Sequence, residues 1–481
     1  MFASRIHPLF LNRGYATRPP SIRQIIASPN FGDCKVLGWV RSARKQKQTS
    51  FLDIGDGSCS QSLQVVASPS QLPAQLNFHS CVAIDGELRP SSHPKQEVEL
   101  VAREVHLLRA CHPAYPFQPR QAASQEHVRG HPTCKAKTNS VQTVMRMRGR
   151  LSRSIHQFFQ DKDYLEIHTP LLTTNDCEGG GDVFTVSAPK KDGEESYWDQ
   201  PVFLTVSGQL HLEAICNGIA RVYTFNPAFR AERGRTRRHL SEFWMVEAEV
   251  AFLDDIDELV SEMEGLVKNA ATDILENCSQ EVMLYNKAAG IGGGISRLEA
   301  ATTGPWHTIE YRDAAAMVSD PKHKLPPLKN GDLGREHELW LCKHIGGVVA
   351  VVNWPAGIKP AYMREVEGSQ GGLVSICSFL NFVCLLFVCS FIIIMKYAHE
   401  KSVFRPIFIR GSPPIQTACC QKEIKRKGGF RLFNLETFCP PAFQINFPVS
   451  VASGNLPPHL TPFRKWKVIM CITLSLCFLF G

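Results

Sequence analysis

The pattern of hydrophobic and polar residues predicts short β-strands in the first part of the chain. Between residues 33 and 110, five strand-like segments are separated by turn residues. These segments read CKVLGWVRSAR, TSFLDIGDG, SLQVVAS, SCVAIDGELR and EVELVAREVHLL. Five such strands in so short a region predict a small, partly open β-barrel.

Basic side chains are interleaved with aromatic rings beside the first turn of this barrel: Arg41, Arg44, Lys45, Lys47, Trp39 and Phe51. A barrel of the OB-fold type often binds single-stranded nucleic acid, whose bases stack on aromatic rings while cations neutralise the phosphates. A solvated basic turn above core aromatic residues would produce the same pattern, so both interpretations stay open.

A helical pattern follows a segment without periodicity. Residues 111–140 are rich in proline and histidine, which predicts a linker or hinge. Beyond it, hydrophobic residues at helical spacing form one stripe, made of Val144, Met147, Leu151, Ile155 and Phe158. The next segment, YLEIHTPLL, predicts a strand closed by Thr169 and Pro170.

Residues 221–252 predict a hairpin, because two β-rich stretches flank a polar, arginine-dense connection. On the second strand, alternation predicts an apolar core face made of Trp244, Val246, Ala248, Val250 and Phe252. The other face carries Phe243, Met245, Glu247 and Glu249.

Parity on the first strand places Arg230 and Glu232 on one face, so an arginine, carboxylates and an aromatic ring can line one cleft. Such a cleft fits an anionic nucleotide. Arg230 would hold a phosphate together with a substrate carboxylate, and Glu232 would accept from an adenine amino group. Phe243 would stack on the base. Surface ion pairs along a hairpin are the plainer alternative.

Composition divides the chain near residue 370. Residues 371–481 contain 12 Lys and Arg against 3 Asp and Glu, whereas the preceding 370 residues contain 41 against 42. The basic excess therefore belongs to the C-terminal part and gives no argument for RNA binding by the rest. The nine cysteines before residue 371 are scattered without a CxxC pair, which indicates reduced thiols and predicts no metal site.

The first 32 residues lack Asp and Glu and carry Arg5, Arg13, Arg18 and Arg23 beside apolar residues. An arginine-rich, acid-free, amphipathic terminus predicts a mitochondrial transit peptide over residues 1–32. An ordinary disordered terminus is the alternative.

Three motifs carry a resemblance to a known family. FRAERGRTRRHLSEF resembles motif 2 of the class II aminoacyl-tRNA synthetases in the aspartyl/asparaginyl branch, and DYLEIHTPLL resembles motif 1, which lies at the dimer interface. FLTVSGQLHLE is similar to the amino-acid-binding turn of that branch. The resemblance covers about residues 33–370. When the predicted transit peptide is taken into account, the chain most resembles the mitochondrial asparaginyl-tRNA synthetases of this family.

The resemblance implies an α+β fold in four parts. These are an OB-fold anticodon-binding barrel (33–110), a hinge (111–140), a catalytic domain with an antiparallel sheet flanked by helices (141–370), and a tail outside the fold (371–481). It also implies binding roles. The amino acid would contact Glu178, Ser207, Gln209, Leu212 and Glu247. The ATP would contact Arg230, Glu232, Arg238, His239, Leu240 and Phe243, with Arg230 and Glu232 catalytic. The anticodon would contact Arg41, Phe51 and Gln64.

The choice between asparagine and aspartate depends on Leu212. The aspartyl enzymes keep a lysine at this point of the turn, which pairs with the substrate side-chain carboxylate. Here the position is apolar, and a buried carboxylate without a partner is costly, so a neutral amide is preferred.

The implied reaction is ATP-dependent activation of asparagine, followed by transfer to tRNA(Asn) in the mitochondrial matrix. Mg²⁺ and Arg230 would stabilise the charge that develops at the α-phosphate. The implied partners are asparagine, tRNA(Asn) and a second copy of the chain bound through motif 1. An aspartyl or non-discriminating enzyme and a catalytically inactive tRNA-binding isoform are the alternatives.

The family pattern stops after about residue 370. The acidic metal-binding residue, the GG-x-x-R segment and motif 3 of the family are absent, and KGGFRLFNLE (427–436) matches the start of motif 3 only by chance. Activity is therefore expected to be impaired. The apolar run 371–395 is long enough to cross a bilayer. A non-homologous terminus is nevertheless favoured over a membrane anchor or a regulated inactive isoform.

Overall fold

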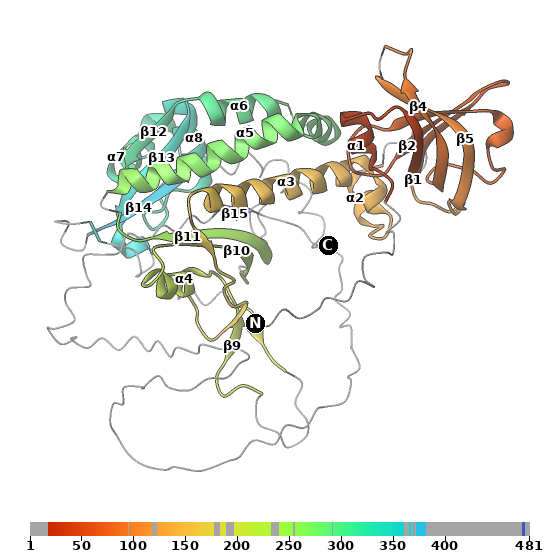
Figure 1. Cartoon of the computed structure of the whole chain (residues 1–481). Helices are drawn as coiled ribbons and strands as arrows, with labels where there is room; N and C mark the ends of the chain where they lie inside the picture. Colours follow the sequence, from red (N-terminus) through yellow and green to blue (C-terminus); the bar gives the residue numbers. More distant parts are fainter. Residues whose placement is uncertain are drawn as a thin grey trace, which may run out of the picture. The chain divides into compact units, whose positions relative to one another are not determined.

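The computed structural model describes residues 18–94, 96–117, 123–177, 183–188, 197–231, 240–253, 255–290, 292–359, 365–366, 369, 372–380 and 474–476. The N-terminal part is a closed five-stranded barrel (Figure 1), with strands β1 (Gly32–Lys45), β2 (Ser50–Gly55), β3 (Leu63–Ala67), β4 (Cys81–Pro90) and β5 (Val98–Arg109). The strand order is β1-β2-β3-β5-β4, in which β3 and β5 are parallel. The five-stranded barrel predicted from the sequence is confirmed.

Helix α1 (Ile22–Ala27) packs onto this barrel and corrects the N-terminal boundary. Ser21 caps the helix through its side chain, and Ile22 and Ile25 are 1% and 3% exposed in the barrel core. The guanidinium of Arg23 donates to the carbonyl oxygen of Ser58 at 2.8 Å. The predicted transit peptide over residues 1–32 is therefore too long, because its last third belongs to the barrel domain. Residues 1–17 lie outside the described residues.

The linker contains short helices that its composition did not predict. These are α2 (Gln125–Arg129) and the 3₁₀ turn η3 (Lys135–Lys137), and helix α3 begins directly after them at Asn139. Thr138 caps α3, since its hydroxyl accepts from the backbone N–H of Val141. The last residues of the hinge therefore form a 3₁₀ turn that leads directly into helix α3, with only Thr138 between them.

The second part is built on the hairpin of β10 (Arg221–Phe229) and β11 (Glu242–Val250), which are antiparallel. The parallel strand β6 (Leu165–Glu166) extends one side, and β15 (Leu474–Leu476) pairs with β11 on the other. Helices α3 (Asn139–Asp161) and α5 (Ile256–Ala289) lie side by side (Figure 1). They pack in one core with the hairpin face formed by Tyr223, Phe225, Val246, Ala248 and Val250.

Alternation along the hairpin thus predicted most of its core face, with one error. Phe252 is 65% exposed and has a φ of 67°, because β11 ends at Val250 and the chain turns away from the sheet. Trp244 is half-buried against the core.

Two smaller sheets complete the described structure. One has the order β12-β13-β14 and consists of β12 (Trp306–Glu310), β13 (Val348–Pro355) and β14 (Leu373–Leu380). Helices α6 (Gly294–Thr303), α7 (Tyr311–Val318) and α8 (Arg335–Ile345) pack with this sheet. The other contains β7 (Leu172–Thr173), β9 (Val202–Leu204) and β8 (Thr185–Val186), and α4 (Gln209–Cys216) follows it.

Strand β14 corrects the predicted boundary at residue 370. It pairs with β13 in antiparallel register and consists of the first residues of the apolar run 371–395. The start of the predicted tail is therefore part of a sheet. No helix among the described residues is long and apolar enough to cross a membrane.

Candidate active site

The candidate site lies on the hairpin face that α3 and α5 do not cover. In the register of β10 and β11, Thr224 stands opposite Glu247 and Val222 opposite Glu249. Because side chains alternate along a strand, the two carboxylates point away from the helical core, toward the side where α4 contacts both strands. Both glutamates are 2% exposed.

Glu247 fixes the turn that precedes α4. One of its carboxylate oxygens accepts from the hydroxyl of Ser207, and the other accepts from the backbone N–H of Gly208 at 2.8 Å. The hydroxyl of Ser207 in turn accepts from the N–H of Gln209 at 3.1 Å. Thr205 supports the same turn, because its hydroxyl donates to the carbonyl oxygen of Ser207 at 2.8 Å. The first residue of α4 is therefore placed by a buried carboxylate.

Gly208 is required at this turn by close approach. A Cβ at this position would lie 2.7 Å from the hydroxyl oxygen of Thr169 and 3.1 Å from the carboxylate of Glu247. Thr169 is itself held by the side-chain amide of Asn226, which donates to its hydroxyl at 3.2 Å. The turn thus sits tightly between the end of the motif 1 segment and the hairpin.

Gln209 is completely buried, and its side chain is only half satisfied. Its amide nitrogen donates to a carboxylate oxygen of Glu249. Its side-chain oxygen has no hydrogen-bond partner among the described residues. Because a buried acceptor without a donor is costly, this oxygen is a natural acceptor for a bound ammonium group. The buried carboxylate of Glu249, which contacts the same side chain, favours a positive charge at this place.

The other residues around the predicted amino-acid site are described by their burial or lie outside the described residues. Leu212 is fully buried on α4, one turn after Gln209. Burial lowers the pKa of His211, so its ring is neutral at physiological pH. Glu178 lies outside the described residues.

The predicted nucleotide side of the cleft is described only in part. The guanidinium carbon of Arg230 lies 5.6 Å from the ring centroid of Phe243, and the backbone N–H of Arg230 donates to the carbonyl of Ser241. Phe243 packs with Ala228, and Leu240 lies beside this pair. Arg230, Leu240 and Phe243 thus lie close together, and their role as ATP contacts stays a prediction. The predicted residues Glu232, Arg238 and His239 lie outside the described residues.

Two contributors were not predicted as site residues. Glu249 was placed on the correct face by alternation, but its contact with Gln209, 40 positions earlier in the chain, has no signal in the sequence. The hydroxyl of Thr224 is buried opposite Glu247 and has no hydrogen-bond partner among the described residues. The presence of a threonine in a strand does not by itself predict that its hydroxyl is buried without a hydrogen-bond partner.

The barrel brings together two of the three predicted anticodon residues. Phe51 and Gln64 are half-buried on the outward faces of adjacent strands, where Arg44 contacts both. Its guanidinium lies 5.7 Å from the Phe51 ring centroid and donates to the side-chain oxygen of Gln64 at 3.4 Å. Arg44 therefore belongs to this surface.

Arg41 does not belong to this surface. It is the extra residue of a β-bulge between Val40 and Ser42, which turns its side chain toward the linker. There the guanidinium donates to the carbonyl oxygen of Lys137 at 2.6 Å and to the side chain of Asn139. Burial lowers the pKa of Arg41. Arg41 therefore links the barrel to the linker, and its contact with the anticodon stays a prediction.

The described residues contain no group of three or more His, Cys, Asp or Glu side chains that could hold a metal ion.

Comparison with known proteins agrees with both parts of the structure. The sequence model of the class II tRNA synthetases (D, K and N) matches residues 125–377, and that of the OB-fold nucleic acid binding domain matches residues 34–108. The chain is 39% identical to asparaginyl-tRNA synthetase of Mus musculus over 353 residues, which are 72% of this chain and 73% of that protein. It is 36% identical to the mitochondrial asparagine–tRNA ligase of Schizosaccharomyces pombe over 363 residues, 72% and 78% of the two chains.

Among solved structures, asparaginyl-tRNA synthetase of Pyrococcus horikoshii in complex with asparaginyl-adenylate has the same fold, with a TM-score of 0.63 and 24% identity. The similarity covers 76% of this chain and 80% of that one. The family match ends within β14, seven residues after the boundary predicted from the sequence. The barrel, the hairpin site and these matches lead to one assignment: the chain belongs to the class II tRNA synthetases of the D, K and N group.

Proposed function

We propose that the chain is an asparagine–tRNA ligase of mitochondria, which activates asparagine with ATP and transfers it to tRNA(Asn). The curated relatives from mouse and fission yeast are named for asparagine. The observation that carries the assignment is Gln209: its buried side-chain oxygen has no donor among the described residues, and its amide nitrogen donates to the buried carboxylate of Glu249. An α-ammonium group would complete this arrangement, with Glu249 orienting the amide of Gln209.

Selection of asparagine rests on Leu212. Because residue 212 is a leucine, and a fully buried one, this position offers no cation to the substrate side chain. A substrate carboxylate would then lose its hydration without gaining a counter-ion, whereas a neutral amide loses less. An aspartyl or non-discriminating enzyme is the alternative, and comparison of the two amino acids in one binding assay distinguishes them.

For the activation step we propose roles that the chain's own side chains can fulfil. Arg230 would hold the substrate carboxylate and the α-phosphate of ATP together, so that the carboxylate oxygen attacks the phosphorus in line. Phe243, with Arg230 at 5.6 Å, would offer its ring to the adenine. Glu232, Arg238 and His239 are proposed as further ATP contacts from the family resemblance, as is Glu178 for the amino acid.

We further propose that activation is slow in this chain, because the sequence after residue 377 lies beyond the family match and lacks motif 3. Asparagine-dependent exchange of pyrophosphate into ATP tests this. The expected rate is close to the rate without asparagine, while the mouse enzyme in parallel shows full exchange. Exchange at a comparable rate would contradict the proposed impairment.

The barrel is proposed to bind the anticodon of tRNA(Asn) through Phe51, Gln64 and Arg44. An aromatic ring, an amide and a guanidinium on one surface suit a stacked base and its phosphate. Replacement of Phe51 by alanine should weaken tRNA binding about tenfold, because stacking contributes about 1–3 kcal/mol per base. If tRNA binding persists without any exchange activity, the chain acts as an RNA-binding protein, which is the second candidate function.

A homodimer formed through motif 1 is proposed from the edge of the hairpin sheet. Strand β6 lies at this edge, and Leu165 within it and Leu172 after it are each 51% exposed. An open strand edge with apolar side chains is a surface for pairing with another chain. In sedimentation analysis, Leu165→Asp should yield monomers, whereas Leu108→Asp, at a similarly exposed leucine on the barrel, should leave the dimer intact. Monomeric wild-type protein would contradict the proposal.

Import into the mitochondrial matrix is proposed to depend on the segment before α1, since α1 itself is built into the barrel. Deletion of residues 1–17 should leave a tagged chain outside mitochondria. Unchanged import of the shortened chain would contradict this.

A further inference from the structure

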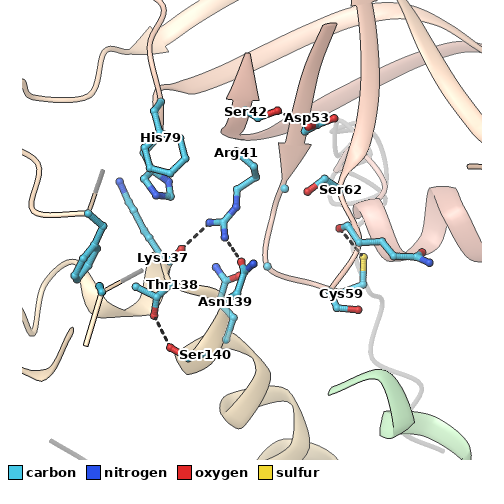
Figure 2. A pocket seen from close by; sticks show the side chains of 18 of the residues that line it. Arg41, Ser42, Asp53, Cys59, Ser62, His79, Lys137, Thr138, Asn139 and Ser140 are labelled. Atoms are coloured by element: carbon cyan, nitrogen blue, oxygen red, sulfur yellow. Dashed lines mark hydrogen bonds between the residues drawn. The ribbon is translucent and has the colours of Figure 1, made fainter. Parts of the chain in front are cut away.

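A polar cleft of about 880 Å³ lies between the barrel and the linker. The barrel wall comes from β1, β2 and the loop that follows β2, and the other wall comes from η3 and the first turn of α3. Figure 2 shows Arg41, His79 and Lys137 around this space, with Asn139 and Ser140 on the helix side. Its volume is in the range of sites that hold a small ligand.

The two walls are tied to each other by hydrogen bonds. Arg41 on the barrel donates to the carbonyl of Lys137, as described above. Arg146 on α3 donates to the carbonyl oxygen of Gly57 at 3.0 Å and forms an ion pair with Glu281 at 2.9 Å. The cleft is therefore part of the built joint between barrel and linker.

The lining carries an excess of positive charge. Arg41, Arg44 and Lys137 line the cleft, against the single carboxylate of Asp53, which already accepts from the hydroxyl of Ser42. Lys137 has no ion-pair partner among the described residues, and its ammonium lies 5.3 Å from the ring centroid of Tyr115. An anionic group would be attracted to this wall.

The lining of the cleft also offers surfaces for a flat, neutral group. Phe78 is half-buried there, and the adjacent His79 is 4% exposed, with no hydrogen-bond partner for its Nδ1 among the described residues. Burial, with Arg41 and Lys137 nearby, lowers the pKa of His79 to about 4. The ring is therefore neutral, and its unpartnered nitrogen suits a hydrogen bond from or to a neutral base edge.

The cleft is continuous with the proposed anticodon surface. Arg44 lines the cleft and also contacts Phe51 and Gln64 on the outer face of the barrel. An RNA strand whose bases lie on the outer face of the barrel can thus continue toward the linker past the guanidinium of Arg44.

We propose that this cleft binds one unstacked nucleotide of the RNA strand, with its phosphate at Lys137 and its base against Phe78 and His79. The proposal rests on the proposed RNA-binding function of the barrel and adds a second site to it. It explains why a cationic side chain without a counter-ion among the described residues stands beside a buried polar ring.

The test is binding of labelled tRNA(Asn) to the full chain, measured by fluorescence anisotropy between about 50 and 200 mM salt. Lys137→Ala should weaken binding about three- to tenfold and should reduce the slope of log K against log salt by about 0.7 to 0.9. Lys135→Ala, in the same 3₁₀ turn but outside the cleft lining, is the matched control and should change neither. Phe78→Leu should weaken binding about fivefold with an unchanged slope.

The outcomes separate this site from the anticodon surface. If Phe51→Ala weakens binding but Lys137→Ala behaves like Lys135→Ala, the cleft proposal is overturned and the barrel function stands. If only Lys137→Ala and Phe78→Leu weaken binding, the cleft stands and the anticodon surface fails. Wild-type protein that does not bind tRNA overturns both. Equal melting temperatures of Lys137→Ala and wild type exclude loss of folding as the cause.

Discussion

Replacement of Glu247 by glutamine should disturb the candidate site without removing volume. Among the described residues, Glu247 accepts hydrogen bonds from the hydroxyl of Ser207 and from the N–H of Gly208. A glutamine has one acceptor oxygen, so its amide nitrogen must face one of these two donors. A buried donor without an acceptor costs about 1–3 kcal/mol, and the remaining bond loses the contribution of the charge. We expect a loss of about 2–3 kcal/mol in the free energy of unfolding.

The same change should reach the proposed substrate contact. The hydroxyl of Ser207 accepts from the N–H of Gln209, so a displaced turn moves the first residue of α4. Urea unfolding measures stability, and titration calorimetry measures asparagine binding, which should weaken at least about tenfold. Glu242→Gln, at the exposed start of the same strand, is the control and should stay within about 0.5 kcal/mol of wild type. If Glu247→Gln matches Glu242→Gln in both measurements, Glu247 does not hold the turn.

Two further predictions concern stability. Gly208→Ala should destabilise the chain by about 1–3 kcal/mol and weaken asparagine binding, because its Cβ would meet the Thr169 hydroxyl at 2.7 Å. Gly149→Ala in α3 is the control and should be neutral or slightly stabilising, since no atom lies within 4 Å of its Cβ. Equal changes in the free energy of unfolding for the two variants would contradict the close approach at Gly208. Arg146→Met should cost about 3–5 kcal/mol, since it leaves the buried Glu281 carboxylate without its partner. The double variant Arg146→Met/Glu281→Leu should recover much of that loss in urea unfolding, and additive effects of the two changes would refute a coupled pair.

Local patterns predicted much of the fold because local physics determines it. The barrel strands and the hairpin alternate between buried and outward residues, so a period of two reveals both the strands and their core faces. The stripe from Val144 to Phe158 on α3 is buried for the same reason at helical spacing.

The errors arose where local patterns do not determine side-chain direction or packing. A bulge re-aimed Arg41, and counting residues along β1 cannot detect an inserted residue. Ile22 and Ile25 appeared as part of an acid-free terminus, although they fill the barrel core. Phe252 continues the alternation in the sequence, but the strand has already ended.

The sequence indicated which residues belong to the candidate site but not the hydrogen bonds between them. Gln209 and Glu247 were assigned through the family resemblance. Their partners Glu249 and Ser207 are brought to them by folding across about 40 residues, and such pairing follows from the antiparallel register and the packing of α4. No spacing in the sequence encodes it.

Calorimetric comparison of asparagine with aspartate tests the central claim most directly, because it does not depend on catalysis. A site with Gln209 and Glu249 at the proposed ammonium position, and with Leu212 in place of a cation, should bind asparagine at least about tenfold more tightly than aspartate, a difference of about 1.4 kcal/mol. Equal affinities, or tighter binding of aspartate, would contradict the account.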